Sequence, residues 1–436
     1  MKIIKSVSTY TLGCRVNQYE TEAVQDLFKK EGYEIKVFDD VADVYIINTC
    51  TVTSFGDKKS RQIIRKAKKK NKDAIVVVMG CYAQAKPEEI AKIEDVDIII
   101  GNNDKSKIVE YVKEYQNSII DKNMVKDIKD SKEFDNLMLL SKHDRTREFI
   151  KIQDGCNQFC SYCIIPYVRG RIRSRKPDLI LHEIENLTKL GYTEFVLTGI
   201  HTASYGKDLE NIDLVDLVYK VYKIDGVKRI RFGSLEPNII DGKFIKMLND
   251  LSDKVCNHFH LSLQSGCDET LKRMNRKYTT KKYMDAVNLL RNNVKDILLT
   301  TDVIVGFPQE TDEEFNKTLE FLKQVKFYKM HIFKYSKREG TVAARLTGQV
   351  ADKVKDLRSE ILLKLSDDNT IWYNNNYIGK TEKVLVETRL KNGYYDGLTN
   401  NYIRVLIDSE EELKKGEIYN VHLKKMEKNN IIGNII

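Results

Sequence analysis

The chain has 436 residues, of which 42% are hydrophobic and 31% are charged, and its formal net charge is +9. A chain of this length is too long for one compact core, so we expect two or three domains of a soluble globular protein. No apolar run approaches the ~18 residues that a membrane span needs, and the first residues do not form a signal peptide. We therefore expect a cytoplasmic protein without a membrane partner, whose positive charge favours a polyanionic partner.

Residues 1–117 alternate short apolar runs with helical patterns. We predict buried strands at residues 44–47, 75–79 and 97–100, and helices around residues 20–30, 58–70 and 87–93. Buried strands that alternate with helices indicate a parallel, doubly wound sheet, so the fold class is α/β.

Three of the eight cysteines share one position in this region. Cys14, Cys50 and Cys81 each lie just past the carboxyl end of a predicted strand. Those ends face one side of a parallel sheet, where open α/β sheets bind their ligands. Thiols stay reduced in the cytosol, so we expect these three to converge as metal ligands rather than to form disulfides. Taken singly, each cysteine would be a small buried hydrophobic residue.

Residues 118–145 have no clear periodicity and are predicted to be a linker. The alternation of strands and helices then resumes in a domain that we place at residues 146–366, with strands expected at residues 149–153, 194–198, 228–233, 257–264, 298–305 and 327–335. Six such units predict a partial TIM-like (βα)6 barrel, whose active site lies at the carboxyl ends of its strands. His201, Ser234, Glu236 and Gln264 lie at these ends.

The first of these strands leads directly into Cys156, Cys160 and Cys163, which are spaced C-x3-C-x2-C. Such a loop wraps three thiolates around a four-iron cube and leaves one iron open for chemistry. The alternative is a zinc or disulfide cluster. Zinc sites normally use paired C-x2-C units, however, and no second pair lies nearby.

Residues 372–436 change to the period of β-strands, with strands expected at residues 383–387, 402–407 and 419–423. Turn signals between them predict a small all-β barrel. Tyrosines alternate here with basic residues, an arrangement that suits stacking on bases and contact with phosphates; they are Tyr394, Tyr395, Tyr402, Arg389, Lys391 and Arg404. The alternative is a solvated face with tyrosines in the core.

Two stretches carry unbalanced positive charge. Residues 58–72 contain many lysines and arginines but no acidic residue, directly after Cys50. They are candidates to hold a phosphate backbone beside the strand-end cysteines, although a charge run is usually a solvated helix face. The same pattern recurs after Cys163, at Arg169, Arg171, Arg173, Arg175 and Lys176.

The order of these motifs resembles the methylthiotransferases of the radical S-adenosylmethionine superfamily over essentially the whole chain. The matching segments are residues 12–17, 48–53, 79–81, 154–170, 263–266 and 306–308. The resemblance implies a methylthiotransferase domain at residues 1–117, a radical domain at 146–366 and a TRAM RNA-binding domain at 372–436. Residues 14–20 and 50–53 are most similar to the branch that methylthiolates N6-threonylcarbamoyladenosine in tRNA, beside the anticodon.

The resemblance also implies two [4Fe-4S] clusters, whose ligands carry over to Cys156, Cys160 and Cys163, and to Cys14, Cys50 and Cys81. With the first cluster, S-adenosyl-L-methionine would yield a 5′-deoxyadenosyl radical that leads to removal of hydrogen from C2 of the adenine ring. With the second, sulfur would be supplied and then methylated by another S-adenosyl-L-methionine. The C2–H bond is neither acidic nor electrophilic, so a cofactor must perform the hard step.

Three further residues are candidates for contact with S-adenosyl-L-methionine. The resemblance places Tyr162 near its adenine, and Ser234 and Glu236 near its ribose or amino group. Cys256 and Cys267 match no ligand position and are expected to be packed cysteines. The implied partners are tRNA and an external electron donor, a reductase that the sequence does not identify, and the source of the sulfur is equally open.

The chemistry of the substrate suggests one more residue. A threonylcarbamoyl group carries a carboxylate, a hydroxyl and a urea, whereas an isopentenyl group is apolar and would need an apolar slot. The loops after Cys14 and Cys50 offer polar groups, among them one fixed positive charge; they are Arg15, Asn17, Gln18, Thr51, Thr53 and Ser54. We therefore predict that Arg15 pairs with the carboxylate of the substrate.

Other functions remain open at this point. The first alternative is the same type of enzyme acting on isopentenyladenosine in tRNA. The second is an enzyme of this type that acts on a ribosomal protein side chain instead of RNA. A protein of another class would be an RNA-binding iron–sulfur protein that transfers electrons or senses redox state, without cleavage of S-adenosyl-L-methionine.

Overall fold

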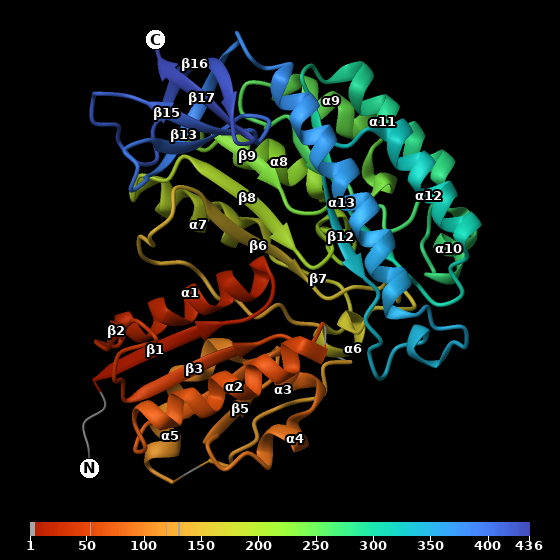
Figure 1. Cartoon of the computed structure of the whole chain (residues 1–436). Coiled ribbons are helices and arrows are strands. Elements are labelled where there is room, and N and C mark those ends of the chain that lie inside the picture. Colours follow the sequence, from red (N-terminus) through yellow and green to blue (C-terminus); the bar gives the residue numbers. More distant parts are fainter. Residues whose placement is uncertain (1–4, 53, 119, 130) are drawn as a thin grey trace.

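The computed structural model describes residues 5–52, 54–118, 120–129 and 131–436 (Figure 1). Its first part is a parallel sheet of five strands in the order β2-β1-β3-β4-β5. The strands are β1 (Ser6–Thr11), β2 (Glu34–Lys36), β3 (Val44–Thr49), β4 (Ile75–Gly80) and β5 (Ile98–Ile100). The helices are α1 (Arg15–Lys30), α2 (Ser54–Lys70), α3 (Cys81–Ala85), α4 (Pro87–Ala91) and α5 (Ile108–Gln116), with a 3-10 turn at Lys105–Lys107.

Helices cover both faces of this sheet. Successive side chains of its strands point to opposite faces, and β3, β4 and β5 are buried on both. Val24 and Phe28 of α1 pack with Ile108 of α5 in one core cluster. Ile64 and Ala67 of α2 belong to a second cluster on the other face. The predicted doubly wound sheet is thereby confirmed, and the helix after Cys14 begins directly at Arg15, five residues earlier than its periodicity suggested.

The second part is a curved set of parallel strands, each followed by a helix. Its strands are β6 (Glu148–Asp154), β8 (Glu194–Gly199), β9 (Arg229–Phe232), β10 (His258–His260), β11 (Leu298–Val305) and β12 (Lys329–Lys334), and the short β7 (Arg173–Ser174) runs antiparallel to β6. Isolated bridges between residues 230 and 255 and between residues 235 and 261 join β9 to the segment of β10. No ladder among the described residues joins β12 to β6, so the barrel is partial, as predicted.

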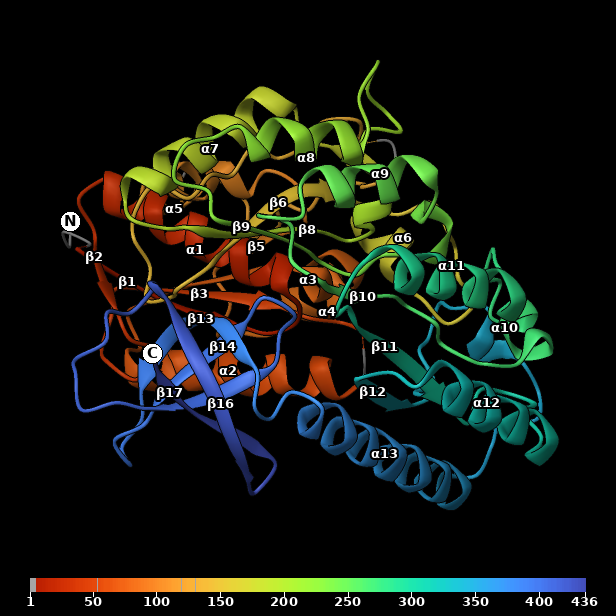
Figure 2. The ribbon, with the colours of Figure 1, turned by 90° about the horizontal axis from the view of Figure 1, so that it is seen from above.

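The helices of this part line the outside of the strands (Figure 2). They are α6 (Ile165–Arg169), α7 (Pro177–Lys189), α8 (Leu214–Tyr222), α9 (Gly242–Asp250), α10 (Asp268–Arg273), α11 (Thr280–Asn293), α12 (Asp312–Val325) and α13 (Asp352–Asn375), with 3-10 turns at Thr202–Ser204, Pro237–Ile239 and Ala343–Arg345. None of the helices in the described part of the chain is both long and apolar enough to cross a bilayer.

The third part is a closed all-β barrel in the order β13-β14-β15-β17-β16, as the change of period predicted. Its strands are β13 (Thr381–Arg389), β14 (Tyr395–Thr399), β15 (Arg404–Asp408), β16 (Ile418–Glu427) and β17 (Asn430–Ile435). Alternating residues such as Val384, Val405 and Val421 fill its core. The barrel follows directly on α13, which extends to Asn375.

Two arginines of β9 hold the barrel at the amino ends of the βα strands. Arg229 donates to the carbonyls of Leu398 and Lys383 at 3.1 and 2.6 Å. Arg231 donates to those of Asn400 and Thr399, both at 2.9 Å. The barrel therefore lies at the rim of the βα strands opposite to their carboxyl ends.

Residues 118–145 contain no helix or strand in the described ranges, and they run between α1 and α7. Leu137 and Leu139 are buried there. The Leu137 carbonyl accepts a hydrogen bond from Tyr19 Oη at 2.8 Å, and the Leu139 amide donates to Glu183 Oε1 at 2.6 Å. The segment thus packs against both neighbouring parts through its backbone.

Candidate active site

The three cysteines after β6, which we call the loop set, lie in a backbone that the rest of the fold holds in place. Gly155 precedes the loop at φ +71°, and a Cβ there would lie 1.8 Å from the Arg171 carbonyl, so only glycine fits. The Cys156 amide donates to the Gly170 carbonyl at 3.0 Å. The Ser161 amide donates to Met274, and its carbonyl accepts from Ala343 at 2.7 Å.

The thiols of the loop set lie close enough to influence one another electrostatically. Desolvation raises the pKa of Cys156 to about 11 and that of Cys163 to about 12, and the neighbouring Cys160 adds to both shifts. Arg276 Nη1 donates to Cys160 Sγ at 3.2 Å. Three crowded thiols with a single cation beside them lose their protons most readily to a metal, and three soft thiolate donors suit an iron–sulfur cluster.

No group of three or more His, Cys, Asp or Glu side chains encloses a single metal ion in the described residues. A cube of four irons does not require such a group, because each thiolate binds a different iron and the donors stand farther apart. That finding therefore does not argue against a cluster.

Glu236 connects the loop set to the carboxyl ends of β8 and β9. His201 Nε2 lies 3.0 Å from Glu236 Oε2, and Gln158 Nε2 donates to the same oxygen at 3.2 Å. Arg276 Nη2 donates to Glu236 Oε1 at 2.7 Å. Burial alone would raise the pKa of Glu236, but the contacts with His201 and Arg276 outweigh burial and lower it. Glu236 is therefore a carboxylate that links the cysteine loop to two strand ends.

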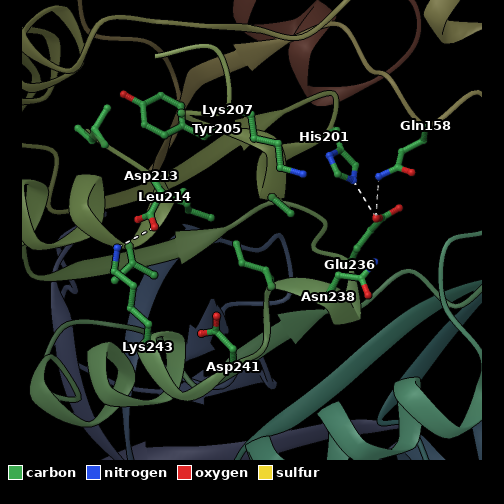
Figure 3. Close-up of a pocket in the computed structure, with 15 residues that line it drawn as sticks. Gln158, His201, Tyr205, Lys207, Asp213, Leu214, Glu236, Asn238, Asp241 and Lys243 are labelled. Carbon is green, nitrogen blue, oxygen red and sulfur yellow. Dashed lines mark hydrogen bonds and ion pairs between the residues drawn. The ribbon is translucent and has the colours of Figure 1, made fainter. Parts of the chain in front are cut away.

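A cavity of about 310 Å³ opens beside this carboxylate. Figure 3 shows His201 and Gln158 both pointing at Glu236 on one side of it, and the ion pair of Asp213 and Lys243 on the other. Such a polar cavity at the ends of barrel strands suits a polar ligand.

The other two predicted cofactor contacts lie on either side of this network. Ser234 is exposed and separated from Glu236 by one extended residue, so that both side chains face the same way. The ring of Tyr162 packs edge-on against Phe307, 6.4 Å between centroids. The roles of Tyr162, Ser234 and Glu236 toward S-adenosyl-L-methionine stay predictions.

The second group of cysteines, which we call the strand-end set, comes from three neighbouring parallel strands. Cys14 follows β1, Cys50 follows β3 and Cys81 begins α3 directly after β4. Asn17 ties the first two loops together, because its Nδ2 donates to the carbonyls of Leu12 and Thr49 at 2.8 and 3.0 Å.

Exposure decreases across the strand-end set: Cys14 is exposed, Cys50 is intermediate and Cys81 is buried. Desolvation raises the pKa of Cys50 to about 11, and the other two thiols add to the shift. The structure therefore brings the strand-end cysteines into one electrostatic neighbourhood. Whether both sets act as ligands stays a prediction.

Arg169 lies between the two sets and is fully buried. Its Nη2 donates to Asn17 Oδ1 at 2.6 Å, and its Nη1 lies 3.0 Å from Glu20 and from Asp154. Lys105 and Lys151 pair with Glu20 at 2.5 and 2.7 Å. We call these five charged groups the buried hub.

The buried hub holds three cations and two carboxylates, and the buried Arg173 lies 3.9 Å from Asp154 as a further cation, so positive charge exceeds negative charge in the interior. Arg169 Nε has no hydrogen-bond partner among the described residues. An excess buried cation with an unused donor is costly unless an anion lies nearby. A cluster with three thiolate ligands has a net negative charge, and Cys14 and Cys81 are the thiols whose charges act on Arg169. The strand-end set thus also fits a cluster.

Two further contacts join the sets. Helix α3, which begins with Cys81, packs against α6, which begins two residues after Cys163. Arg338, from the segment after β12, donates to Asp57 Oδ2 at 2.6 Å and to Thr51 Oγ1, directly beside Cys50. The same segment supplies the Ala343 amide that binds the loop set. Both cysteine sets therefore lie beside the interface between the first and second parts of the protein.

Arg15 directly follows Cys14, and its side chain points to the start of β6. Its guanidinium stacks 4.9 Å above the ring of Phe149, and its Nη1 donates to Gln18 at 3.0 Å. It lines a cavity of about 340 Å³ between α1, the start of β6 and the C-terminal barrel. The pairing of Arg15 with the substrate carboxylate stays a prediction. Thr53, another polar residue of the predicted substrate loops, lies outside the described residues.

The interpretation of the basic residues after Cys163 as an RNA contact is wrong for three of them. Arg169, Arg173 and Arg175 are at most 2% exposed, because acidic residues inside the protein take up their charge; the pairs are Arg169–Asp154, Arg173–Asp154 and Arg175–Glu183. They offer nothing to RNA.

In the C-terminal barrel, Tyr395 is 3% exposed and belongs to the core. Tyr402 stacks on His258 at 4.7 Å with the guanidiniums of Arg231 and Arg147 over its ring, so it joins two parts of the protein. Neither tyrosine is free to stack on a base.

Sequence reasoning missed Arg276 and Arg338, and treated His201 only as a residue of the rim. Arg276 meets Cys160 across 116 residues and Arg338 meets Asp57 across 281. No local spacing signals such contacts. Cys256 and Cys267 are each 1% exposed, in agreement with packed cysteines.

Residues 150–322 match the model of the radical SAM superfamily, and residues 6–101 match that of uncharacterized protein family UPF0004. The chain is 44% identical to threonylcarbamoyladenosine tRNA methylthiotransferase MtaB of Bacillus subtilis (strain 168), over 96% of this chain and 94% of the relative. It is 40% identical to the protein of that name from Aquifex aeolicus (strain VF5), over 94% and 98%.

A second group of relatives has a different name. The chain is 36% identical to tRNA-2-methylthio-N(6)-dimethylallyladenosine synthase of Thermodesulfovibrio yellowstonii (strain ATCC 51303 / DSM 11347 / YP87), over 99% of both chains. Among solved structures, the radical S-adenosylmethionine methyltransferase TsrM from Kitasatospora setae, with cobalamin and [4Fe-4S] cluster bound, has a TM-score of 0.57 at 14% identity, over 78% of this chain and 74% of that chain. This last likeness shows a shared fold.

Proposed function

Because this chain belongs to the methylthiotransferase family of the radical S-adenosylmethionine superfamily, we propose that it replaces the C2 hydrogen of N6-threonylcarbamoyladenosine in tRNA with a methylthio group. Both relatives of highest quoted identity have this activity in their names, at 44% and 40% identity. The observation that supports the proposal is that two sets of three cysteines lie beside one interface between two parts of the protein. A substrate atom between them would meet hydrogen removal from one side and sulfur from the other.

The loop set is the proposed ligand set of the [4Fe-4S] cluster that the family uses with S-adenosyl-L-methionine. Cys156, Cys160 and Cys163 would hold three irons and leave the fourth to the amino acid end of S-adenosyl-L-methionine. Together these groups supply, when bound, the radical that removes hydrogen from C2. Glu236 presents a carboxylate beside the loop, suited to a hydroxyl or an ammonium group, and Tyr162 presents an aromatic ring for the adenine.

The strand-end set is the proposed ligand set of a second [4Fe-4S] cluster. Cys14, Cys50 and Cys81 would hold it, with the excess charge of the buried hub as its counter-charge. An open iron there is where the sulfur to be transferred would bind. Arg169 and Arg338 position this set against the loop set, because each makes buried contacts in both parts of the protein.

Arg15 is the proposed partner of the threonylcarbamoyl carboxylate. Of the four cations that line its cavity, Arg145, Arg147 and Lys415 are paired with carboxylates. Arg15 has only Gln18 as a hydrogen-bond partner within the described ranges. A guanidinium without a counter-ion in a polar cavity discriminates against an apolar isopentenyl group, which would leave it unpaired.

The proposal is tested with two matched tRNAs that differ only in the group on N6, given to the anaerobically reconstituted enzyme with a chemical reductant. Mass spectrometry of the nucleosides should detect methylthiolation of the threonylcarbamoyl form alone. Arg15→Gln should lose most of this turnover, whereas Arg15→Lys should keep part of it. Preference for the isopentenyl form would overturn the substrate assignment and leave the family chemistry intact. Turnover of neither form, with 5′-deoxyadenosine still produced, would direct attention to a protein substrate.

The same proposal includes a cytoplasmic location and an external electron donor. If cells without this gene lack methylthiolated threonylcarbamoyladenosine and regain it with the gene, the assignment holds in the cell as well.

A further inference from the structure

The basic stretch of helix α2 divides into two groups of residues in the structure. Four of its cations pair with carboxylates of the same part of the protein, on two flanks of the helix; the pairs are Arg61–Glu89, Lys66–Asp39, Lys68–Asp97 and Lys70–Asp39. Three carboxylates, one of them shared by Lys66 and Lys70, offset most of the charge of these four cations, so they have less to offer an outside partner.

Another group lies between these flanks. Lys58, Gln62, Arg65 and Lys69 are spaced i, i+4, i+7 and i+11, which places them on one face of the helix. All four are exposed, and their three cations have no carboxylate partner among the described residues. The opposite face carries Ile64 and Ala67, buried against the sheet. We call this row of four residues the exposed stripe.

The exposed stripe lines an open cavity of about 940 Å³, and the rest of the lining is Tyr10, Lys59, Arg61, Ile63 and Lys66. From Lys58 to Lys69 the helix rises ~16 Å. The cations therefore form a line and do not converge on one point. A single small anion would meet only one or two of them, whereas a chain of phosphates would meet all three.

The position of the stripe is fixed relative to the cysteines. Helix α2 begins at Ser54, shortly after Cys50, and Arg338 holds Asp57 in its first turn. In Figure 1 helix α2 and the C-terminal barrel lie at opposite ends of the molecule, and in Figure 2, seen from above, both lie on the side away from α7 and α8. A ligand that contacts the barrel and enters between the cysteine sets would pass along this side.

We propose that the exposed stripe binds the phosphate backbone of the tRNA substrate next to the nucleotide that reacts. The inference rests on the proposed function, since it takes its partner from there. It assigns RNA binding to the first part of the chain in addition to the C-terminal barrel, and within α2 to one face only.

The test compares two double variants of one helix, each of which removes two charges. Arg65→Gln with Lys69→Gln removes charges of the stripe, and Lys68→Gln with Lys70→Gln removes charges that pair with Asp97 and Asp39 and do not line the cavity. Binding of a tRNA that carries N6-threonylcarbamoyladenosine is measured over a series of salt concentrations. The stripe variant should reduce the slope of log K against log salt by about 1 to 2, because each lost phosphate contact reduces it by about 0.7 to 0.9. The control should change the slope by less than about 0.5.

Iron content and circular dichroism should match the wild type in both variants, because all four side chains are on the surface. Equal slopes in the wild type and the stripe variant would overturn the inference. The inference would also be overturned if the stripe variant kept the salt slope of tRNA binding but its iron was reduced more slowly by an acidic electron-donor protein. The stripe would then bind that protein instead of tRNA.

Turnover separates the inference from the proposed function. If the wild type methylthiolates tRNA and the stripe variant binds it with an unchanged slope, only the inference fails. If the wild type binds tRNA through the stripe but modifies no adenosine, the proposed function fails and the inference stands. A wild type that does not bind tRNA at all would overturn both.

Discussion

The loop set and the strand-end set each present three thiols, but the fold holds them in different ways. Cys156, Cys160 and Cys163 belong to one short loop, whose backbone amides and carbonyls are bonded to neighbouring segments. The strand-end cysteines come from three loops that only the sheet brings together. Their arrangement further depends on side chains from the other part of the protein, above all Arg169 and Arg338. A local motif can hold its ligands by itself, whereas a tertiary motif depends on the packing of the interface.

Removal of the cysteines gives the largest effects. Cys156→Ala, Cys160→Ala and Cys163→Ala together should remove about half of the iron of the reconstituted protein and stop cleavage of S-adenosyl-L-methionine. Cys14→Ala, Cys50→Ala and Cys81→Ala should also remove about half of the iron, yet leave cleavage detectable without methylthiolation. Iron analysis and 5′-deoxyadenosine assays measure both. Cys256→Ala is the control and should keep all the iron; a strand-end variant that does likewise would show that only the loop set binds a cluster.

Glu20→Gln should have the next largest effect, on stability. It leaves the buried cations Lys105, Lys151 and Arg169 with Asp154 as the one carboxylate of the hub, and loss of a buried partner typically costs about 3 to 5 kcal/mol. Denaturant unfolding should detect this, and the strand-end set should lose its iron before the loop set does. Asp250→Asn breaks an exposed pair with Lys246 and should change the unfolding midpoint little. Similar midpoints for both variants would mean that the hub does not hold the interface.

Arg338→Gln should act on one set and spare the other. It removes a charged hydrogen bond from Asp57 and Thr51, worth roughly 1.5 to 3 kcal/mol, so local opening near Cys50 should increase about 10-fold or more. In the metal-free protein, mass spectrometry should find faster alkylation of Cys50 and an unchanged rate at Cys156. Arg345→Gln, an exposed position of the same segment, is the control. Acceleration at both cysteines would indicate a general loosening instead.

The smallest effect is expected away from both sets, at His143. Burial alone would lower the pKa of His143, but the hydrogen bond with Asp26 at 3.1 Å and the nearby carboxylates outweigh burial and raise it. A raised pKa contributes stability that is fully present below the unfolded value of about 6.5 and is lost as pH rises through the folded value. The paired Asp26 has its pKa lowered to about 2, so its own contribution is lost only in acid.

The wild type should therefore lose stability on the order of 1 kcal/mol as the pH rises from about 6 to 9, and His143→Gln should flatten this dependence. Unfolding midpoints across that range measure it. Parallel curves for both proteins would show that the pair does not contribute.

The difference between the two sets also explains what the sequence revealed. Strands β3, β4 and β5 were predictable because each is an apolar run, and Cys50 and Cys81, which follow β3 and β4, could be placed by topology alone. Strand β2 is three residues long without an apolar run, and α3 is only five residues long, so neither produced a periodic signal. Arg169 was read as a residue for RNA because charge in a sequence does not disclose its partners, and Glu20 lies 149 residues away.

The way in which Arg229 and Arg231 hold the C-terminal barrel bears on how such a protein can change. All four of the hydrogen bonds that they make to the barrel go to backbone carbonyls. Every amino acid supplies a carbonyl, so the attachment of the barrel is indifferent to most substitutions at residues 398–400. Side chains on the outer surface of the barrel can therefore change, and give the barrel a new binding specificity, while these backbone contacts keep the barrel in the same position on the enzyme.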